Sequence, residues 1–139
     1  MLERVRGPQG AISVTTDSVM SIDDVDIRDC RGDEGGAIYT DASSVSLERV
    51  LIEGCEGQTG GGIAAMSGTV VMQSVRITDS IADSGGGLYV GSGAAVTAED
   101  VVMSGNVASK GGHITIDGGS LLWARGALPP ANAPTRNLS

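Results

Sequence analysis

The sequence predicts an all-β chain whose short strands stack as a parallel β-helix, with about 25 residues and three short strands in each coil. Three observations predict this fold. A glycine-pair marker recurs at a nearly constant interval, and a second marker keeps the same interval. Within each interval, apolar residues alternate with polar ones, as they do along β-strands. An antiparallel β-sandwich is the main alternative.

The two markers share one register. The first is a glycine pair that precedes an aliphatic residue. The aliphatic residues are Ile38, Ile63, Leu88 and Ile114, which are spaced by 25, 25 and 26 residues. The second ends, at the same spacings, on Ile27, Ile52, Ile77 and Met103. Ile12 lies 26 residues before Ile38 and continues the first marker, with Gln9 in place of one glycine. Two independent markers in step indicate a true repeat.

Each coil is expected to bend at a polar corner. Apolar residues are two apart along each strand, but three separate Leu47 from Val50, so the alternation breaks at Glu48-Arg49. The equivalent corners are also polar: Asp23-Asp24, Gln73-Ser74 and Glu99-Asp100. The glycine pairs mark a further corner, where positive φ or a close approach of two backbones is expected.

Stacking coils about 4.8 Å apart places equivalent residues in ladders and closes a core that one coil could not form alone. The expected core ladders are Ile38/Ile63/Leu88/Ile114, Val45/Val70/Val96/Leu121, Leu47/Met72/Ala98/Trp123 and Val50/Val75/Val101. They are almost entirely aliphatic. This matches a chain that contains no Phe.

Composition excludes several classes of function. The net charge is −8, and the single Lys and eight Arg are scattered, so a nucleic-acid partner is not expected. No run reaches the 18 apolar residues of a membrane span, and no export signal is recognised. Glycine fills 22 of 139 positions, far above the usual share, yet 40% of the chain is hydrophobic, so a buried core is expected.

We expect the β-helix to span residues 1–125, about four and a half coils, and an irregular Pro/Ala-rich tail to span 126–139. Leu2-Glu3-Arg4-Val5 repeats Leu47-Glu48-Arg49-Val50, so the chain is expected to start within a coil. No polar cap is recognised at either end. The stack is therefore expected to belong to a longer parent chain or to associate end to end.

Cys30 and Cys55 are 25 residues apart and occupy one ladder position, which continues as Ser80 and Asn106. At the strand spacing, two stacked cysteines lie within the range of a disulfide, so Cys30–Cys55 is a candidate bridge. The alternative is two free, buried thiols at a position that requires a small residue. Two cysteines without histidine partners do not form a zinc site, and neither a metal nor a cofactor is expected.

No catalytic set is recognised. His113, the only histidine, has no partner that completes a nucleophilic triad and is expected to be exposed. The densest acidic segment runs from Asp23 to Asp29, but no ladder of carboxylates continues from it across the coils, so it is expected to be a solvated acidic face, with weak calcium binding as the alternative. The chain is therefore not expected to be an enzyme.

Tyr39 and Tyr89 occupy one outward position two coils apart, with Ala64 between them. Two rings about 10 Å apart could stack on a sugar chain. They are the candidate ligand-binding residues.

The repeat resembles that of the polymorphic outer-membrane proteins, which carry a Gly-Gly-Ala-Ile and a Phe-x-x-Asn tetrapeptide in each coil. The first is present at Gly35-Gly36-Ala37-Ile38, and the second is matched in spacing by the tetrapeptides ending at Cys30, Cys55, Ser80 and Asn106. Only Asn106 keeps the family's final residue, and no tetrapeptide keeps Phe. The resemblance covers residues 9–123 and implies a right-handed β-helix, surface exposure and adhesion.

The expected function is that of a non-catalytic structural or adhesive segment of a secreted or surface-exposed protein. Its partner would be a glycan or a protein of a host surface. The alternative is a fragment of a carbohydrate-active enzyme, either a polysaccharide lyase or a glycoside hydrolase. Such an enzyme should carry long loops that wall a groove, whereas these repeat lengths differ by a single residue.

Overall fold

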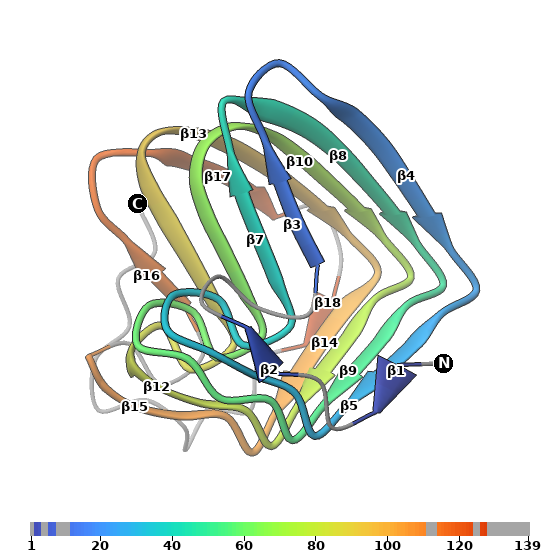
Figure 1. Ribbon diagram of the computed structural model, residues 1–139, viewed down its shortest axis with the longest axis vertical. Helices are drawn as coiled ribbons and strands as arrows, with labels where there is room; N and C mark the ends of the chain where they lie inside the picture. Colours follow the sequence, from blue (N-terminus) through green and yellow to red (C-terminus); the bar gives the residue numbers. More distant parts are fainter. Residues whose placement is uncertain (1, 4–5, 8–11, 111–113, 124–125, 128–139) are drawn as a thin grey trace.

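The structure is a computed structural model that describes residues 2–3, 6–7, 12–110, 114–123 and 126–127. Each coil follows a roughly triangular path, and successive coils lie on one another (Figure 1). Every pairing between the described strands is parallel. This confirms the stacked β-helix and excludes the antiparallel sandwich.

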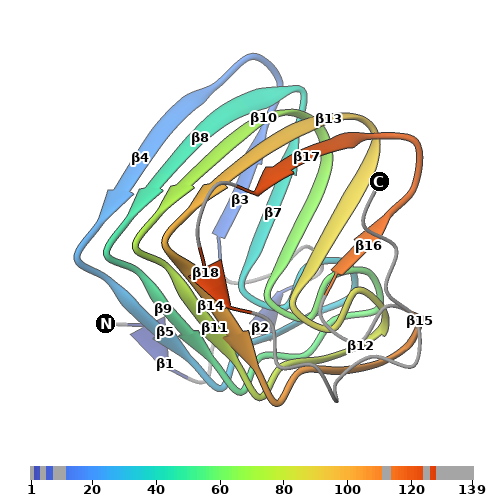
Figure 2. The ribbon, with the colours of Figure 1, turned by 180° about the vertical axis from the view of Figure 1, so that it is seen from behind.

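The stack has three faces of strands. The first face holds β3 (Ile12–Thr15), β7 (Ile38–Asp41), the beginnings of β10 (Ile63–Gln73) and β13 (Leu88–Glu99), and β16 (Ile114–Ile116). The second face holds β4 (Val19–Asp23), β8 (Ser43–Glu48), the ends of β10 and β13, and β17 (Ser120–Trp123). The third face holds β1 (Leu2–Glu3), β5 (Asp26–Arg28), β9 (Leu51–Glu53), β11 (Arg76–Thr78), β14 (Val101–Ser104) and β18 (Gly126–Ala127). Figure 2 shows the third face from behind.

A short return segment joins the third face of one coil to the first face of the next. It contains two further parallel pairs: β2 (Arg6–Gly7) with β6 (Arg31–Gly32), and β12 (Ile81–Ser84) with β15 (Val107–Lys110). Bridges through Glu56 connect β6 to β12. The repeat pattern predicts three strands per coil and does not predict these additional pairs.

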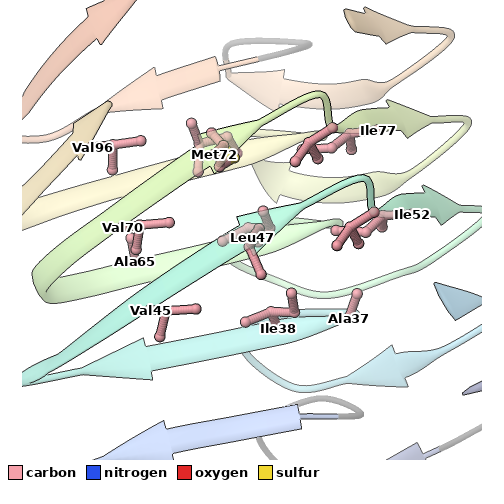
Figure 3. Close-up of a cluster of buried hydrophobic side chains, with 14 of the residues drawn as sticks. Ala37, Ile38, Val45, Leu47, Ile52, Ala65, Val70, Met72, Ile77 and Val96 are labelled. Carbon is pink, nitrogen blue, oxygen red and sulfur yellow. The ribbon is translucent and has the colours of Figure 1, made fainter. Parts of the chain in front are cut away.

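The predicted core ladders are confirmed. Ile63 pairs in register with Ile38 and with Leu88, and the row continues to Ile114. Val45, Val70 and Val96 form the next row, which ends at Leu121. Val45, Val70 and Val96 point into the stack above one another (Figure 3), and the first three residues of each row are almost fully buried. Removing this apolar surface from water is the main source of stability.

The predicted bend is also confirmed. Its second residue has positive φ, between 54° and 56°, in each described coil, at Asp24, Arg49, Ser74 and Asp100. At the glycine corner, Gly60 has φ of +77° and Gly85 of +63°. A Cβ on Gly36 would lie 2.6 Å from the backbone nitrogen of Glu56, so here glycine allows two backbones to approach closely.

The identical letters at Leu2-Glu3 and Leu47-Glu48 do not share one register. Leu2 pairs with Ile27, which is in register with Ile52, and not with the row that contains Leu47. The length of the following segment explains this. Ten residues separate Leu2 from Ile12, close to the eleven between Ile27 and Ile38, whereas sixteen separate Leu47 from Ile63. Leu2-Glu3 therefore lies on the third face, whereas Leu47-Glu48 lies on the second.

At the other end, β18 pairs with β14, so the described stack includes residue 127, two residues past the predicted boundary at 125. Residues 128–139 of the predicted tail lie outside the described residues. In the described part of the chain, no helix has the length and apolarity that a membrane crossing requires.

Candidate functional site

The tyrosine column lies on the outside of the first face. Ala64 pairs in register with Tyr39 on one side and with Tyr89 on the other, as the repeat spacing predicts. The side chains are less open than predicted. Tyr39 is only 7% exposed and Ala64 is fully buried, whereas Tyr89 is partly exposed. The two rings therefore do not form an open platform for a sugar. The alternation along a strand predicts the direction in which a side chain points, but it does not predict whether neighbouring segments cover that side chain.

Carboxylates surround both phenols. The Tyr89 hydroxyl donates a 2.9 Å hydrogen bond to Oδ2 of Asp117. Burial raises the pKa of Tyr89, and the bond to Asp117 and the charges of Asp117 and Glu34 raise it further. Burial likewise raises the pKa of Tyr39, with Asp41 and Glu34 adding to the effect. Both phenols therefore stay protonated at neutral pH and can donate hydrogen bonds.

A hollow of about 250 Å³ lies over the return segment. It is lined by Arg31, Gly32, Asp33, Glu56, Gly57, Gln58, Ile81, Ala82 and Asp83. The guanidinium of Arg31 and the carboxylate of Glu56 form an ion pair at 3.1 Å. Ile81 is 52% exposed and pairs in register with Val107, which is 59% exposed. This surface is not predicted from the sequence, although Arg31, Glu56, Ile81 and Val107 recur in it at the same 25- and 26-residue spacings.

The acidic segment of the first coil is linked to the next coil by Arg49. The Nε atom of Arg49 donates to Oδ1 of Asp24 at 2.6 Å, and Nη2 donates to Oδ1 of Asp23 at 2.6 Å. Nη1 of Arg49 also bonds the Glu48 carboxylate. The bond from Arg49 lowers the pKa of Asp24. Part of the predicted acidic face is therefore an exposed ion-pair cluster between two coils.

The candidate Cys30–Cys55 disulfide is not formed in the structure: both residues are free thiols, and both are buried. The thiol of Cys30 donates to the carbonyl oxygen of Arg28 at 3.3 Å. Burial is the largest of the effects that raise the pKa of Cys55 to about 12. Among the described residues, no three His, Cys, Asp or Glu side chains are grouped to hold a metal ion. His113 lies outside the described residues.

A family model described as the right-handed β-helix region matches residues 4–127, most of the chain. The chain belongs to the right-handed β-helix family. Comparisons with curated proteins and with solved structures give no match. The family match covers every described strand except β1 and establishes the handedness of this β-helix. The narrower resemblance to polymorphic outer-membrane proteins stays a prediction.

Proposed function

We propose that this right-handed β-helix is a non-catalytic structural or adhesive segment that acts at the cell surface or outside the cell. Its partner is a glycan or a protein of a host surface. The observation that carries the proposal is the constancy of the coil. From Ile38 to Ile114 the equivalent residues pair from coil to coil with a single shift, between Ala65 and Ser67, and the coil lengths differ by one residue. Regular coils produce broad, repeated outer faces rather than a groove walled by inserted loops.

The first face and the return segment offer the best contact surface. Here the partly exposed Tyr89 lies beside Asp117, and the hollow exposes Ile81 between polar side chains. Aromatic and aliphatic groups bordered by hydrogen-bonding residues are typical of both sugar-binding and protein-binding surfaces. The exposed outer side of the second face carries small residues such as Ser44, Ser46 and Thr69, together with the exposed Val19 and Val71, but no aromatic side chain among the described residues.

Binding of the whole chain to a panel of glycans and extracellular matrix proteins tests the proposal. Tyr89→Ala and Ile81→Ser are expected to weaken binding of the captured partner at least tenfold. Thr69→Ala on the second face is the matched control and should leave binding unchanged. Equal binding by all three variants would show that the partner does not contact the surface around Tyr89 and Ile81.

The same assay separates adhesion from the enzymatic alternative. Polysaccharides that are bound and recovered intact support a binding segment. Release of shortened or unsaturated sugar products would instead support a fragment of a lyase or hydrolase. Protease accessibility on intact cells tests the proposed location, because an internal chain would be protected.

A further inference from the structure

The two cysteines occupy one position in adjacent coils, between paired residues. Before them, Arg28 pairs in register with Glu53, and after them a bridge joins Arg31 to Glu56. The strand spacing therefore places the two Cα atoms about 4.8 Å apart. A disulfide accepts Cα separations of about 4.4 to 6.8 Å. The backbone requires no shift to bring the two residues within range.

Side chains at this position also reach into the preceding coil. Asn106, three coils on from Cys30, donates from Nδ2 to the carbonyl oxygen of Ile77 at 2.9 Å. Its Oδ1 accepts a 2.9 Å bond from the backbone nitrogen of Ser80, the equivalent residue one coil earlier. The Sγ atom of Cys55 lies between the two coils, 3.6 Å from the carbonyl oxygen of Glu53 in its own coil and 3.9 Å from that of Ile27 in the preceding coil. The thiol of Cys55 thus lies on the side that faces the coil carrying Cys30.

We propose that Cys30 and Cys55 are an oxidative modification site, at which an intramolecular disulfide joins two coils when the chain folds in the presence of a low-molecular-weight disulfide. The thiolate of one cysteine attacks the small disulfide, forming a mixed disulfide and releasing one small thiol. The second thiolate attacks the protein sulfur of that mixed disulfide and releases the second small thiol. Two protein thiols are oxidised, one small disulfide is reduced, and its two products take up the two protons.

The oxidation belongs to folding because the folded stack shields both sulfurs. Cys30 is 1% exposed and Cys55 is fully buried. The thiolate is the attacking species, and a thiol whose pKa is raised by burial supplies little of it at neutral pH. A chain that folds under reducing conditions therefore keeps its two free thiols, and a chain that folds under oxidising conditions keeps its disulfide. The inference is independent of the proposed adhesive function.

The test compares two orders of addition with the full chain. Reduced, unfolded protein is refolded with a mixture of oxidised and reduced glutathione, and separately with a dithiol reductant alone. Alkylation in denaturant followed by intact-mass analysis counts the free thiols. We expect none after oxidative refolding, in a monomer, and two after reductive refolding. Oxidised glutathione added to the already folded, reduced protein should leave both thiols free.

Cys55→Ser is the matched variant, because serine fills this ladder position at Ser80 in the next coil. It should fold to the same circular dichroism spectrum and gain at most a mixed disulfide on Cys30. Oxidised wild type should melt above reduced wild type, with no such difference in the variant. Two alkylatable thiols after oxidative refolding, a bridge only between chains, or a lower melting temperature would overturn the proposal. Rapid oxidation of the folded, reduced protein would contradict the proposal that the disulfide forms only during folding.

Discussion

At the scale of the residue, Thr40 places a hydroxyl inside an apolar column. Thr40 is fully buried, its Oγ1 has no hydrogen-bond partner, and its neighbours in the ladder are Val14 and Ala65. A buried polar group without a partner costs about 1 to 3 kcal/mol. Thr40→Val keeps the shape and removes the hydroxyl, so it should raise the free energy of unfolding by about 1 kcal/mol. Urea unfolding measures the change.

Thr69→Val is the control for this substitution, since Thr69 is exposed on the second face. It should change the free energy of unfolding by less than about 0.5 kcal/mol. A loss of stability in Thr40→Val would show that the hydroxyl is satisfied in solution.

Tyr89 makes a prediction for alkaline pH. Its pKa is raised in the folded protein, so the folded state holds the phenolic proton more tightly than the unfolded state. The resulting stability is complete below the ordinary tyrosine pKa of 10.0 and is lost as the pH rises through the folded value. Asp117→Asn removes one cause and should lower the pKa of Tyr89, as seen in the tyrosinate absorbance. Asp83→Asn should leave the titration unchanged.

The sequence predicts residue positions better than residue surroundings. It places Tyr39, Ala64 and Tyr89 in one outward row because the repeat spacing alone determines that row. It does not predict that Tyr39 is buried, because burial depends on segments from other parts of the coil. It likewise treats Asp24 as part of a solvated acidic face, although Arg49 stands 25 residues on and pairs with it.

At the scale of the element, the bend between the second and third faces depends on one left-handed residue per coil. At Ser74, φ is 56°. This left-handed conformation costs an L-residue about 1 to 2 kcal/mol, and the cost is highest for a β-branched residue. Because Ser74 already bears the general cost, Ser74→Val should lower the free energy of unfolding only by the additional strain of a β-branched residue, about 1 kcal/mol. Ser74→Gly should not, because glycine adopts positive φ readily. Equal melting temperatures for the two variants would argue against a left-handed bend.

The glycine corner depends on space rather than on φ alone. A Cβ on Gly61 would overlap the carbonyl oxygen of Gly86 and lie 2.7 Å from both backbone N and O of Ile81. Gly61→Ala should therefore cost about 3 kcal/mol or more, because backbone atoms cannot move aside cheaply. A Cβ on Gly93 meets only Ser67, whose Cβ lies 3.0 Å and whose Cα lies 3.7 Å away. Gly93→Ala is the control and should retain most of the stability; circular dichroism melts compare the two.

Regular elements are predictable where two signals agree. The core ladders follow from the two markers and from alternation, and the structure confirms them. The pairing of the first strand is not predictable from matching letters, because the number of residues between Leu2 and Ile12 determines which residue Leu2 pairs with. The return segment is missed for another reason. Its row of Arg31, Glu56, Ile81 and Val107 contains both charged and apolar residues. A repeat is therefore not recognisable at this position from residue polarity.

At the scale of the whole molecule, a stack of coils is stabilised mainly by contacts between neighbours. A coil between two others is therefore expected to be more protected than one at the edge of the described stack. Position 45 shows this difference. Val45 is 3% exposed between its neighbours, whereas Met20, its partner in the first described coil, is 36% exposed. The interior surface is thus less covered at this edge.

Hydrogen exchange should follow the same gradient. β4 pairs only with β8 among the described strands, so alternate amides of β4 lack a strand partner, whereas β8 is paired on both sides. Amides of β4 are expected to exchange faster than those of β8 and of the second half of β10. Exchange followed by mass spectrometry at low protein concentration measures this order. Equal protection in the three strands that disappears on dilution would instead show that a second copy covers this edge, as end-to-end association predicts.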